Sequence, residues 1–292
     1  MSRPTVCISL ALFAFGGSQA AAMNLRMEAS TAWAENISRS SAASDWRDAQ
    51  KFEMNTALSL LREWHTGFVT SGELGVGFER VPRYTKLDTF TAGTAVQVRQ
   101  KFGFGAYAPV LSLDAGLRAR AAQLDASDGW TATAGLRLAK RLTPSWRVAA
   151  TGDWQQHYAR NAIFDTKHHR AFGTVTWDFN ERWSLTHGNG RLWGSFTANA
   201  SAAVWSRALS GALGSNISTY YNTIHWGVTG TYGPRWVSYL VDGRISFWWL
   251  ELSPAIGRNT SLPLRYDSLF SVNKVGVKYR QDVWTVQVLH RF

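Results

Sequence analysis

Residues 111–118 read LSLDAGLR, and every second side chain in this stretch is apolar. The apolar set of Leu111, Leu113, Ala115 and Leu117 alternates with the polar or small set of Ser112, Asp114, Gly116 and Arg118. Successive side chains of a β-strand point to opposite faces, so a period of two places these sets on opposite sides of an extended chain. This stretch therefore predicts a strand with one apolar face and one polar face.

The same alternation recurs through most of the chain. It is found at residues 24–35, 51–60, 73–79, 90–99, 130–138, 146–155, 170–179, 262–267 and 284–292. Strands of about ten residues are long enough to cross the hydrocarbon layer of a membrane at a tilt. Because such a strand needs no long apolar run, a mean hydropathy of -0.19 is compatible with a membrane protein.

The connections between these segments alternate in length. The longer ones are 36–50, 80–88, 121–128 and 158–166, and the shorter ones are 62–66, 100–105, 142–145 and 180–182. Long external and short periplasmic connections are typical of transmembrane β-barrels. Aromatic side chains gather at the short-turn end, as an interfacial girdle would: Trp64, Phe102, Phe104, Tyr107, Trp146, Phe179 and Trp183.

The sequence thus predicts an all-β fold, a closed antiparallel transmembrane β-barrel. Closure is required because an open sheet edge in lipid leaves N–H and C=O groups unpaired. Both termini are expected in the periplasm, so the number of strands is even, with twelve favoured and fourteen as the alternative. Residues 197–235 decide between the two, because 208–234 are rich in Gly, Ser, Thr and Asn and show no clear strand pattern.

The amino terminus has the layout of a cleavable Sec-type signal peptide. Arg3 precedes an apolar segment at 6–15 that is too short to span a bilayer, and 16–22 is a tail of mostly small side chains. The predicted division is therefore a signal peptide at 1–22 and a barrel at 23–292. The single cysteine, Cys7, lies in the apolar segment, so no disulfide or thiolate metal site is expected in the exported chain.

The chain is basic, with a net charge of +11, and it contains 15 tryptophans. Export argues against nucleic acid as the partner of these charges. Lipopolysaccharide, an anionic permeant or a basic lumen are the better explanations. The tryptophans fit rings that collect at a membrane–water interface.

The last strand carries a recognisable ending. Trp284, Val286, Val288 and Phe292 occupy alternate positions up to the terminal aromatic residue, and His290 departs from the apolar pattern. This ending resembles the carboxyl-terminal signature of Gram-negative outer-membrane β-barrel (porin-like) proteins, although no narrower family can be matched. The resemblance implies an outer-membrane location, contact with outer-membrane lipid and lipopolysaccharide, and assembly by periplasmic chaperones and the barrel-assembly machinery, which would read these four residues.

The polar faces of the strands are the candidate pore lining. The basic candidates are Arg99, Arg118, Arg120, Arg137, Arg147 and Arg170. The acidic candidates are Glu28, Glu53, Glu73, Glu79, Asp114, Asp153 and Asp178. An acidic arc that faces a basic arc produces a transverse field, which favours small hydrophilic and anionic solutes. The first hypothesis is therefore a passive outer-membrane channel, and the alternative is a plugged structural or surface-interaction barrel, favoured if 197–235 pack inside.

Two weaker motifs do not change this interpretation. His187-Gly188-Asn189-Gly190 is similar to the His-x-Ser-Asn-Gly motif of outer-membrane phospholipase A, but the nucleophilic serine is missing, so a hydrolase is only a third hypothesis. His157, Asp165, His168 and His169 surround one external connection, yet neighbouring Lys and Arg side chains would repel a cation. No catalytic residue, metal or cofactor is therefore predicted.

Overall fold

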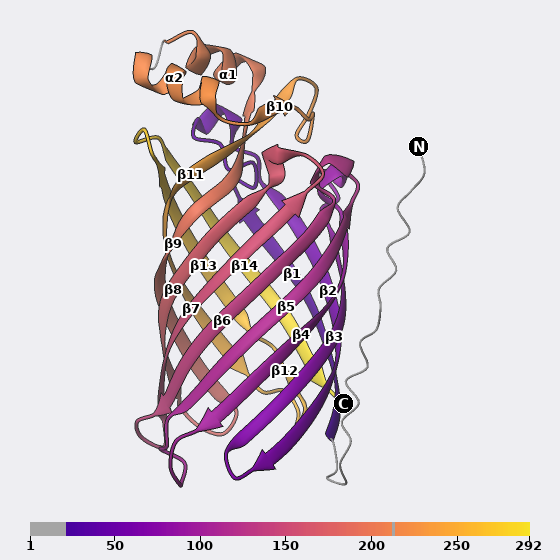
Figure 1. The fold of residues 1–292 in the computed structure, drawn as a ribbon, viewed down its shortest axis with the longest axis vertical. Helices are drawn as coiled ribbons and strands as arrows, with labels where there is room; N and C mark the ends of the chain where they lie inside the picture. Colours follow the sequence, from indigo (N-terminus) through magenta and orange to yellow (C-terminus); the bar gives the residue numbers. More distant parts are fainter. Residues whose placement is uncertain (1–21, 212–213) are drawn as a thin grey trace.

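The protein is a closed antiparallel β-barrel (Figure 1). The computed structural model describes residues 22–211 and 214–292, so the predicted signal peptide lies outside the described residues except for Ala22. The wall strands are β1 (Ala22–Glu35), β2 (Ala49–His65), β3 (Phe68–Arg80), β4 (Thr89–Lys101), β5 (Val110–Ala122), β6 (Gly129–Arg141), β7 (Trp146–Ala159), β8 (Thr166–Asp178), β9 (Trp183–Ser201), β11 (Trp236–Pro254), β13 (Leu264–Asn273) and β14 (Lys278–Arg291). Each pairs with the next, and β14 pairs back with β1 from Arg26↔Arg291 to Glu35↔Asp282.

The wall has twelve strands, as the sequence predicts, and the segment at 197–235 explains why it does not have fourteen. Residues 197–201 continue β9, and the described residues that follow include α1 (Ala202–Leu209), α2 (Ser215–Thr223) and the short strand β10 (Trp226–Val228). Both helices lie above one end of the barrel in Figure 1, which we call the loop end. The other end, where β14 finishes and the two-residue strand β12 (Thr260–Ser261) pairs with it, is the turn end. None of the described helices is long and apolar enough to cross a membrane.

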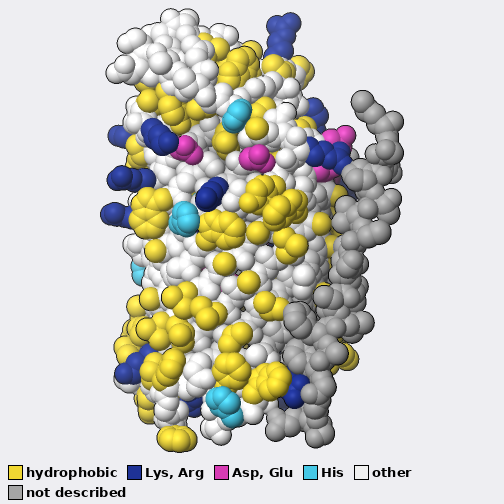
Figure 2. Space-filling view, in the orientation of Figure 1, with side chains coloured by type: hydrophobic (Ala, Val, Ile, Leu, Met, Phe, Trp, Pro, Cys, Tyr) yellow, Lys and Arg dark blue, Asp and Glu magenta, His cyan; other side chains and the backbone are white. Residues whose placement is uncertain are grey.

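The apolar faces of the strands form the outside of the barrel. Leu113 of β5 pairs with Val98 of β4 and Leu136 of β6, and all three side chains are exposed. A soluble protein would bury such a row, whereas lipid is a favourable environment for it. Figure 2 shows apolar side chains over the middle of the visible wall, with Lys, Arg, Asp and Glu side chains only above and below that zone. The wall is therefore built to face a hydrocarbon layer.

Aromatic side chains mark both edges of the apolar zone. The seven rings predicted at the turn end are all exposed, from Phe179 at 40% to Phe104 at 92%. Trp146 and Trp177 stack there with parallel planes and centroids 5.7 Å apart. Towards the loop end, Trp130 and Tyr158 stack at 4.1 Å. Rings of this kind prefer the membrane–water interface, so the two girdles place the turn end and the loop end on opposite sides of the membrane.

The eight connections predicted between residues 36 and 182 follow the alternation with one difference. The connection at 102–109 is as long as the one at 81–88 on the opposite side. The predicted connection ended at residue 105, but β5 begins only at Val110, which pairs with Lys101 at the end of β4. The turn between β2 and β3 has only residues 66–67, where Gly67 adopts φ +85.

Four loop-end connections share a motif that the sequence analysis missed. Each contains a short 3-10 helix followed by an aspartate that accepts a hydrogen bond from a backbone amide at or just after the end of the preceding strand. The helices are η1 (Ala43–Asp45), η2 (Thr85–Leu87), η3 (Asp125–Ser127) and η4 (Ala162–Phe164). The bonds are Asn36 N to Asp48 Oδ1 at 3.1 Å, Val81 N to Asp88 Oδ1 at 2.7 Å, Ala122 N to Asp128 Oδ1 at 2.6 Å and Ala159 N to Asp165 Oδ1 at 2.5 Å. Gln123 N and Arg160 N also donate to the carbonyls of Asp88 and Asp128, which ties neighbouring loops together.

The first loop and the β9–β11 connection pack together into a cap at the loop end. Asn199 Nδ2 donates to Ser38 O at 2.9 Å, and Ser201 N donates to Asp45 Oδ2 at 2.6 Å. Tyr232 OH donates to Ile37 O at 2.8 Å. Because the polar atoms of Ser38, Asp45 and Asn199 are buried and bonded to one another, the cap is held in one arrangement.

Beneath α1 and α2 lies a buried aromatic cluster of Trp205, Tyr221, Tyr239 and Tyr279. The hydroxyls of Tyr221 and Tyr279 are 3.0 Å apart and form a hydrogen bond. Burial raises the pKa of Tyr221 above its ordinary value, so this hydroxyl stays protonated and able to donate. The cluster fixes the two helices to the top of β11 and β14.

Replacing Asp128 by Ala tests the repeated aspartate motif. The change leaves the amide of Ala122 without its acceptor, and we expect the barrel to lose about 1 kcal/mol of stability. The measurement is the temperature at which half of the protein loses its compact gel mobility. Asp125→Ala, in the 3-10 helix that directly precedes Asp128, is the control, because Asp125 is exposed. Equal midpoints for both variants would contradict the proposed role of the motif.

Candidate functional site: the barrel lumen

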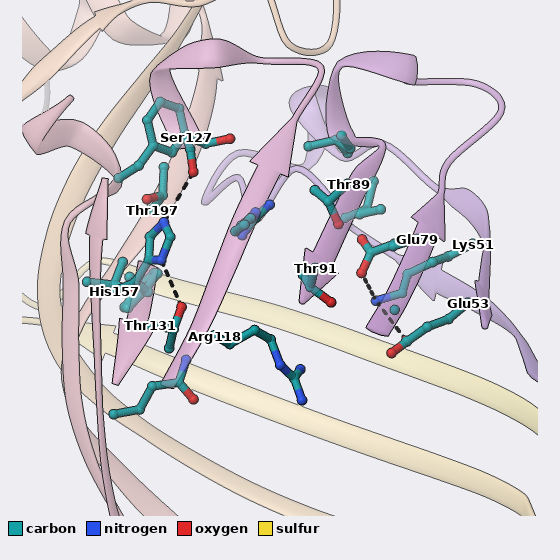
Figure 3. Close-up of a pocket in the computed structure, with 18 of the residues that line it drawn as sticks. Lys51, Glu53, Glu79, Thr89, Thr91, Arg118, Ser127, Thr131, His157 and Thr197 are labelled. Atoms are coloured by element: carbon teal, nitrogen blue, oxygen red, sulfur yellow. Dashed lines mark hydrogen bonds and ion pairs between the residues drawn. The ribbon is translucent and has the colours of Figure 1, made fainter. Parts of the chain in front are cut away.

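The lumen contains a cavity of about 940 Å³ to which all twelve wall strands contribute residues. It begins at the loop end, where Arg39, Lys86 and Tyr232 line it, and it reaches Ser30 and Glu73 in the middle of the wall. Figure 3 shows the polar side chains that point into it. The cavity is therefore the inside of the barrel and not a gap between loops.

The predicted acidic side chains on β1, β2 and β3 all have cationic neighbours. Lys51 Nζ lies 2.7 Å from Glu79 and 3.6 Å from Glu53, as the dashed lines in Figure 3 mark. Arg26 lies 3.1 Å from Glu28 and 3.5 Å from Glu73. Two cations thus form ion pairs with four carboxylates, so the net negative charge of the predicted acidic arc is half of its formal value.

On the other side of the lumen, two predicted arginines are held by carboxylates. Arg170 Nη2 of β8 lies 2.8 Å from Asp153 of β7, and Nε of the same guanidinium donates to this carboxylate at 3.0 Å. Arg147 Nη2 lies 2.7 Å from Asp178, and Arg141 is 3.8 Å from the same side chain. These contacts stabilise neighbouring strands. The Arg170–Asp153 pair is neutral, whereas Arg141 and Arg147 share one carboxylate and leave one net positive charge there.

Four predicted arginines have no such partner. Within the described part of the chain, Arg99, Arg118, Arg120 and Arg137 make no ion pair with any residue at 4.0 Å or less, and neither does Asp114. The four lie on the adjacent strands β4, β5 and β6. We call them the arginine strip.

The register places the arginine strip on the inner face of the wall. Arg118 lines the cavity and points into it in Figure 3. Ser112, on the same face of β5, pairs with Arg99 on one side and Arg137 on the other. Arg99, Arg118 and Arg137 are exposed although they point inward, so water reaches them inside the barrel. Arg120 is half-buried, and its Nε makes no hydrogen bond to a described residue.

Glycines on the inner face make room for the arginine strip. Gly93 pairs with Arg118, and a Cβ at Gly93 would stand 2.9 Å from the Cα of Arg118 and 2.6 Å from the carbonyl of Leu117. Gly75 of β3 and Gly116 of β5 also line the cavity. A wall without side chains at these positions leaves the guanidinium groups free to extend into the lumen.

The opposite wall carries inward-facing aromatic rings that the sequence analysis did not identify. Phe172 of β8 packs edge-on against Trp249 and Phe247 of β11, with centroids 5.5 and 6.2 Å apart. A Cβ at Gly188 would overlap the ring of Trp249, and one at Gly190 would overlap the side chain of Phe172. This patch could have been predicted from two patterns in the sequence. Gly188 and Gly190 occupy alternate positions of β9, and Phe247 and Trp249 occupy alternate positions of the neighbouring strand β11.

This patch explains the motif at 187–190. Gly188 and Gly190 face the lumen and accommodate the rings, whereas His187 and Asn189 are exposed on the other face of β9. The likeness to the phospholipase motif therefore coincides with a glycine-rich strand in contact with aromatic rings.

The histidines around the η4 connection do not converge. His157 and His168 line the lumen, while His169 lies on the outer wall. His157 Nε2 donates to the carbonyl of Ser127 at 3.2 Å, and its Nδ1 is 2.9 Å from the hydroxyl of Thr131 (Figure 3). Among the described residues no group of three or more His, Cys, Asp or Glu side chains could hold a metal ion.

The predicted assembly signal lies on the outer face of the last strand. Trp284, Val286, Val288 and Phe292 are all exposed, and the amide of Phe292 donates to the carbonyl of Leu25 at 2.9 Å. Recognition of these residues by an assembly machinery stays a prediction.

No known family profile matches the sequence, and no curated protein matches it either. The fold is similar to that of an outer-membrane channel from Pseudomonas putida F1, with a TM-score of 0.55 and 11% identity over 94% of this chain and 97% of that chain. The KdgM porin aligns more loosely, with a TM-score of 0.39 and 12% identity over 90% of this chain and 99% of its own. The likeness to the Pseudomonas channel concerns the fold, a closed antiparallel β-barrel.

Proposed function

We propose that the protein is a passive channel of a Gram-negative outer membrane that conducts small hydrophilic solutes and prefers anions. The observation that carries the proposal is the arginine strip, four lumen-facing guanidinium groups without an ion-pair partner among the described residues. The apolar wall and the two aromatic girdles support the membrane location.

The preference for anions follows from the balance of charge in the lumen. An anion about 8 Å from one guanidinium gains about 2 kcal/mol at an effective permittivity of about 20. A cation gains less electrostatic energy from the acidic side chains on the opposite side of the lumen, because Lys51 and Arg26 already neutralise part of their charge. Since Arg99, Arg118 and Arg137 are exposed to water, a solute that passes them exchanges hydration for contacts with guanidinium groups.

The position of the β9–β11 connection supports an open barrel. The described residues of this connection, 202–211 and 214–235, lie at and above the loop end instead of filling the lumen (Figure 1). The alternative function, a closed barrel that meets partners at its surface, is favoured by the cap, because Ile37 and Arg39 of the first loop line the cavity and narrow its entrance. Conductance separates the two functions.

Reversal of charge in the arginine strip tests the channel. In planar bilayers with a potassium chloride gradient, we expect stable steps and an anion-selective reversal potential. In the triple variant Arg99→Glu, Arg118→Glu and Arg137→Glu, the anion-to-cation permeability ratio is expected to fall about tenfold, equivalent to about 1.4 kcal/mol. Lys140→Glu is the matched control, because Lys140 lies on the outer face of β6, one strand position beyond the inward-facing Ala139.

A folded barrel that stays silent in the bilayer would contradict the channel and favour the surface-interaction function. If the triple variant conducts with unchanged selectivity, only the role of the arginine strip is contradicted, and the channel function stands.

Release of the cap tests whether the first loop restricts the pore. In Asp45→Ala combined with Asn199→Ala, the first loop loses the bond from Ser201 N to Asp45 Oδ2 and the bond from Asn199 Nδ2 to Ser38 O. We expect the single-channel conductance to rise, because Ile37 and Arg39 can then move away from the entrance. Ser44→Ala is the control, since Ser44 is exposed within the same loop. Unchanged conductance in the double variant would show that the cap does not limit the flow.

A further inference from the structure

The outer wall contains a second concave site, a groove of about 980 Å³ across β8, β9, β11 and β13 near the loop end. It is lined by Lys167, His169, Arg191, Trp193, Arg244 and Lys274, all of which are exposed. These side chains lie on the face of the barrel that is turned towards lipid, and the proposed channel does not use them. We call this site the basic groove.

The strand register brings the cations of the basic groove close together. Trp193 pairs with His169 on one side and with Arg244 on the other, so the three form one row. Arg191 is two positions before Trp193 on β9 and occupies the next row towards the turn end. Neighbouring strands are about 4.8 Å apart and alternate residues of one strand about 6.8 Å apart, so Arg191 and Arg244 can reach a single bound group.

The groove exists because β8 and β9 separate. Their pairing ends at His168↔Gly194, while β9 continues to pair with β11 as far as Ser201↔Trp236. Gly194 has φ +141, and a Cβ there would overlap the carbonyl of Lys167. Ser195 Oγ then accepts a hydrogen bond from Lys167 N at 2.8 Å, which fixes the upper end of β8 beside the gap.

The cations of the basic groove are largely uncompensated. Lys274 lies 2.8 Å from Asp242, and this pair is neutral. Lys167, Arg191 and Arg244 make no ion pair at 4.0 Å or less with any residue in the described ranges. Charged side chains on a lipid-facing wall are unfavourable unless an anion accompanies them. Three such cations on adjacent strands therefore indicate an anionic ligand.

The basic groove is a feature of one side of the barrel. On the outer face of β3, β4 and β6 the positions near the loop end are Phe78, Phe90 and Trp130, with Arg80 at the very end of β3. A girdle that served only to position the barrel would carry similar side chains all around. The concentration of cations on β8, β9 and β11 thus requires a reason specific to that side.

We propose that the basic groove binds the phosphate groups of an outer-leaflet phosphoglycolipid, the class to which lipid A belongs. The guanidinium groups of Arg191 and Arg244 suit the bidentate geometry of a phosphate, and Lys167 adds a point charge. Trp193 and Phe270 line the same groove and offer apolar surface to the sugar and the first part of an acyl chain. The inference depends on the proposed outer-membrane location but not on conduction.

The test is binding of lipid A to the purified, folded barrel in a neutral detergent, with bound lipid counted by native mass spectrometry. The probes are lipid A with two phosphates and the same lipid after removal of both phosphates. The variant is Arg191→Gln combined with Arg244→Gln, because glutamine removes the charges and keeps polar length. Arg80→Gln is the matched control, since Arg80 is an outward arginine at the loop end of β3.

We expect wild type and Arg80→Gln to retain the phosphorylated lipid and the double variant to bind it about tenfold more weakly, the effect of losing charged hydrogen bonds at an exposed site. Equal binding of the phosphorylated and dephosphorylated lipids would overturn the proposal, as would equal binding by the double variant. Displacement of the lipid by millimolar inorganic phosphate would overturn the assignment to a lipid. Unchanged conductance in the double variant separates this site from the channel.

Discussion

No water is available inside a bilayer to satisfy backbone N–H and C=O groups, so the closed ring of strand pairing is the constraint on which the rest of the structure depends. The ring is completed by β1 and β14, whose pairing spans Arg26↔Arg291 to Glu35↔Asp282. Once the ring is closed, every strand has an outer face for lipid and an inner face for water. The period of two in the sequence is the direct result, because a shift of one residue would exchange the two faces.

The inner face must then accommodate many charges in a small space. Carboxylates and cations on neighbouring strands neutralise one another where the strands are rich in both, as in the contacts of Lys51 with Glu79 and of Arg170 with Asp153. Arg99, Arg118 and Arg137 remain outside this pairing, opposite glycine and serine positions. The selectivity that we propose thus arises from the net positive charge that remains after the structural ion pairs have formed. This remaining charge depends on which strands are neighbours.

The fold could be predicted from the sequence because alternation, as at 111–118, is a local property that the closed barrel preserves. The direction of each predicted lumen residue follows from the same rule. Contacts between distant positions could not be predicted in this way. The ring of Trp249 against Gly188 and the bond of Asp128 to Ala122 depend on register and loop geometry, which a single strand does not encode. The helices α1 and α2 could not be predicted from the sequence pattern, because they are short and their apolar residues face the aromatic cluster around Trp205 and Tyr239.

The separation of β8 from β9 at Gly194 links the inside of the barrel to the outside. Beyond this residue β9 and β11 continue as a ribbon from Asp242↔Ser195 to Trp236↔Ser201, and the short strand β10 pairs with the other edge of β11 from Trp226↔Tyr239 to Val228↔Val237. The inner side of the ribbon carries Asn199, which holds the first loop across the entrance of the lumen. Its departure from β8 also leaves the gap that becomes the basic groove on the outer wall. One glycine with a positive φ therefore permits both the cap over the lumen and the cationic site that faces the lipid.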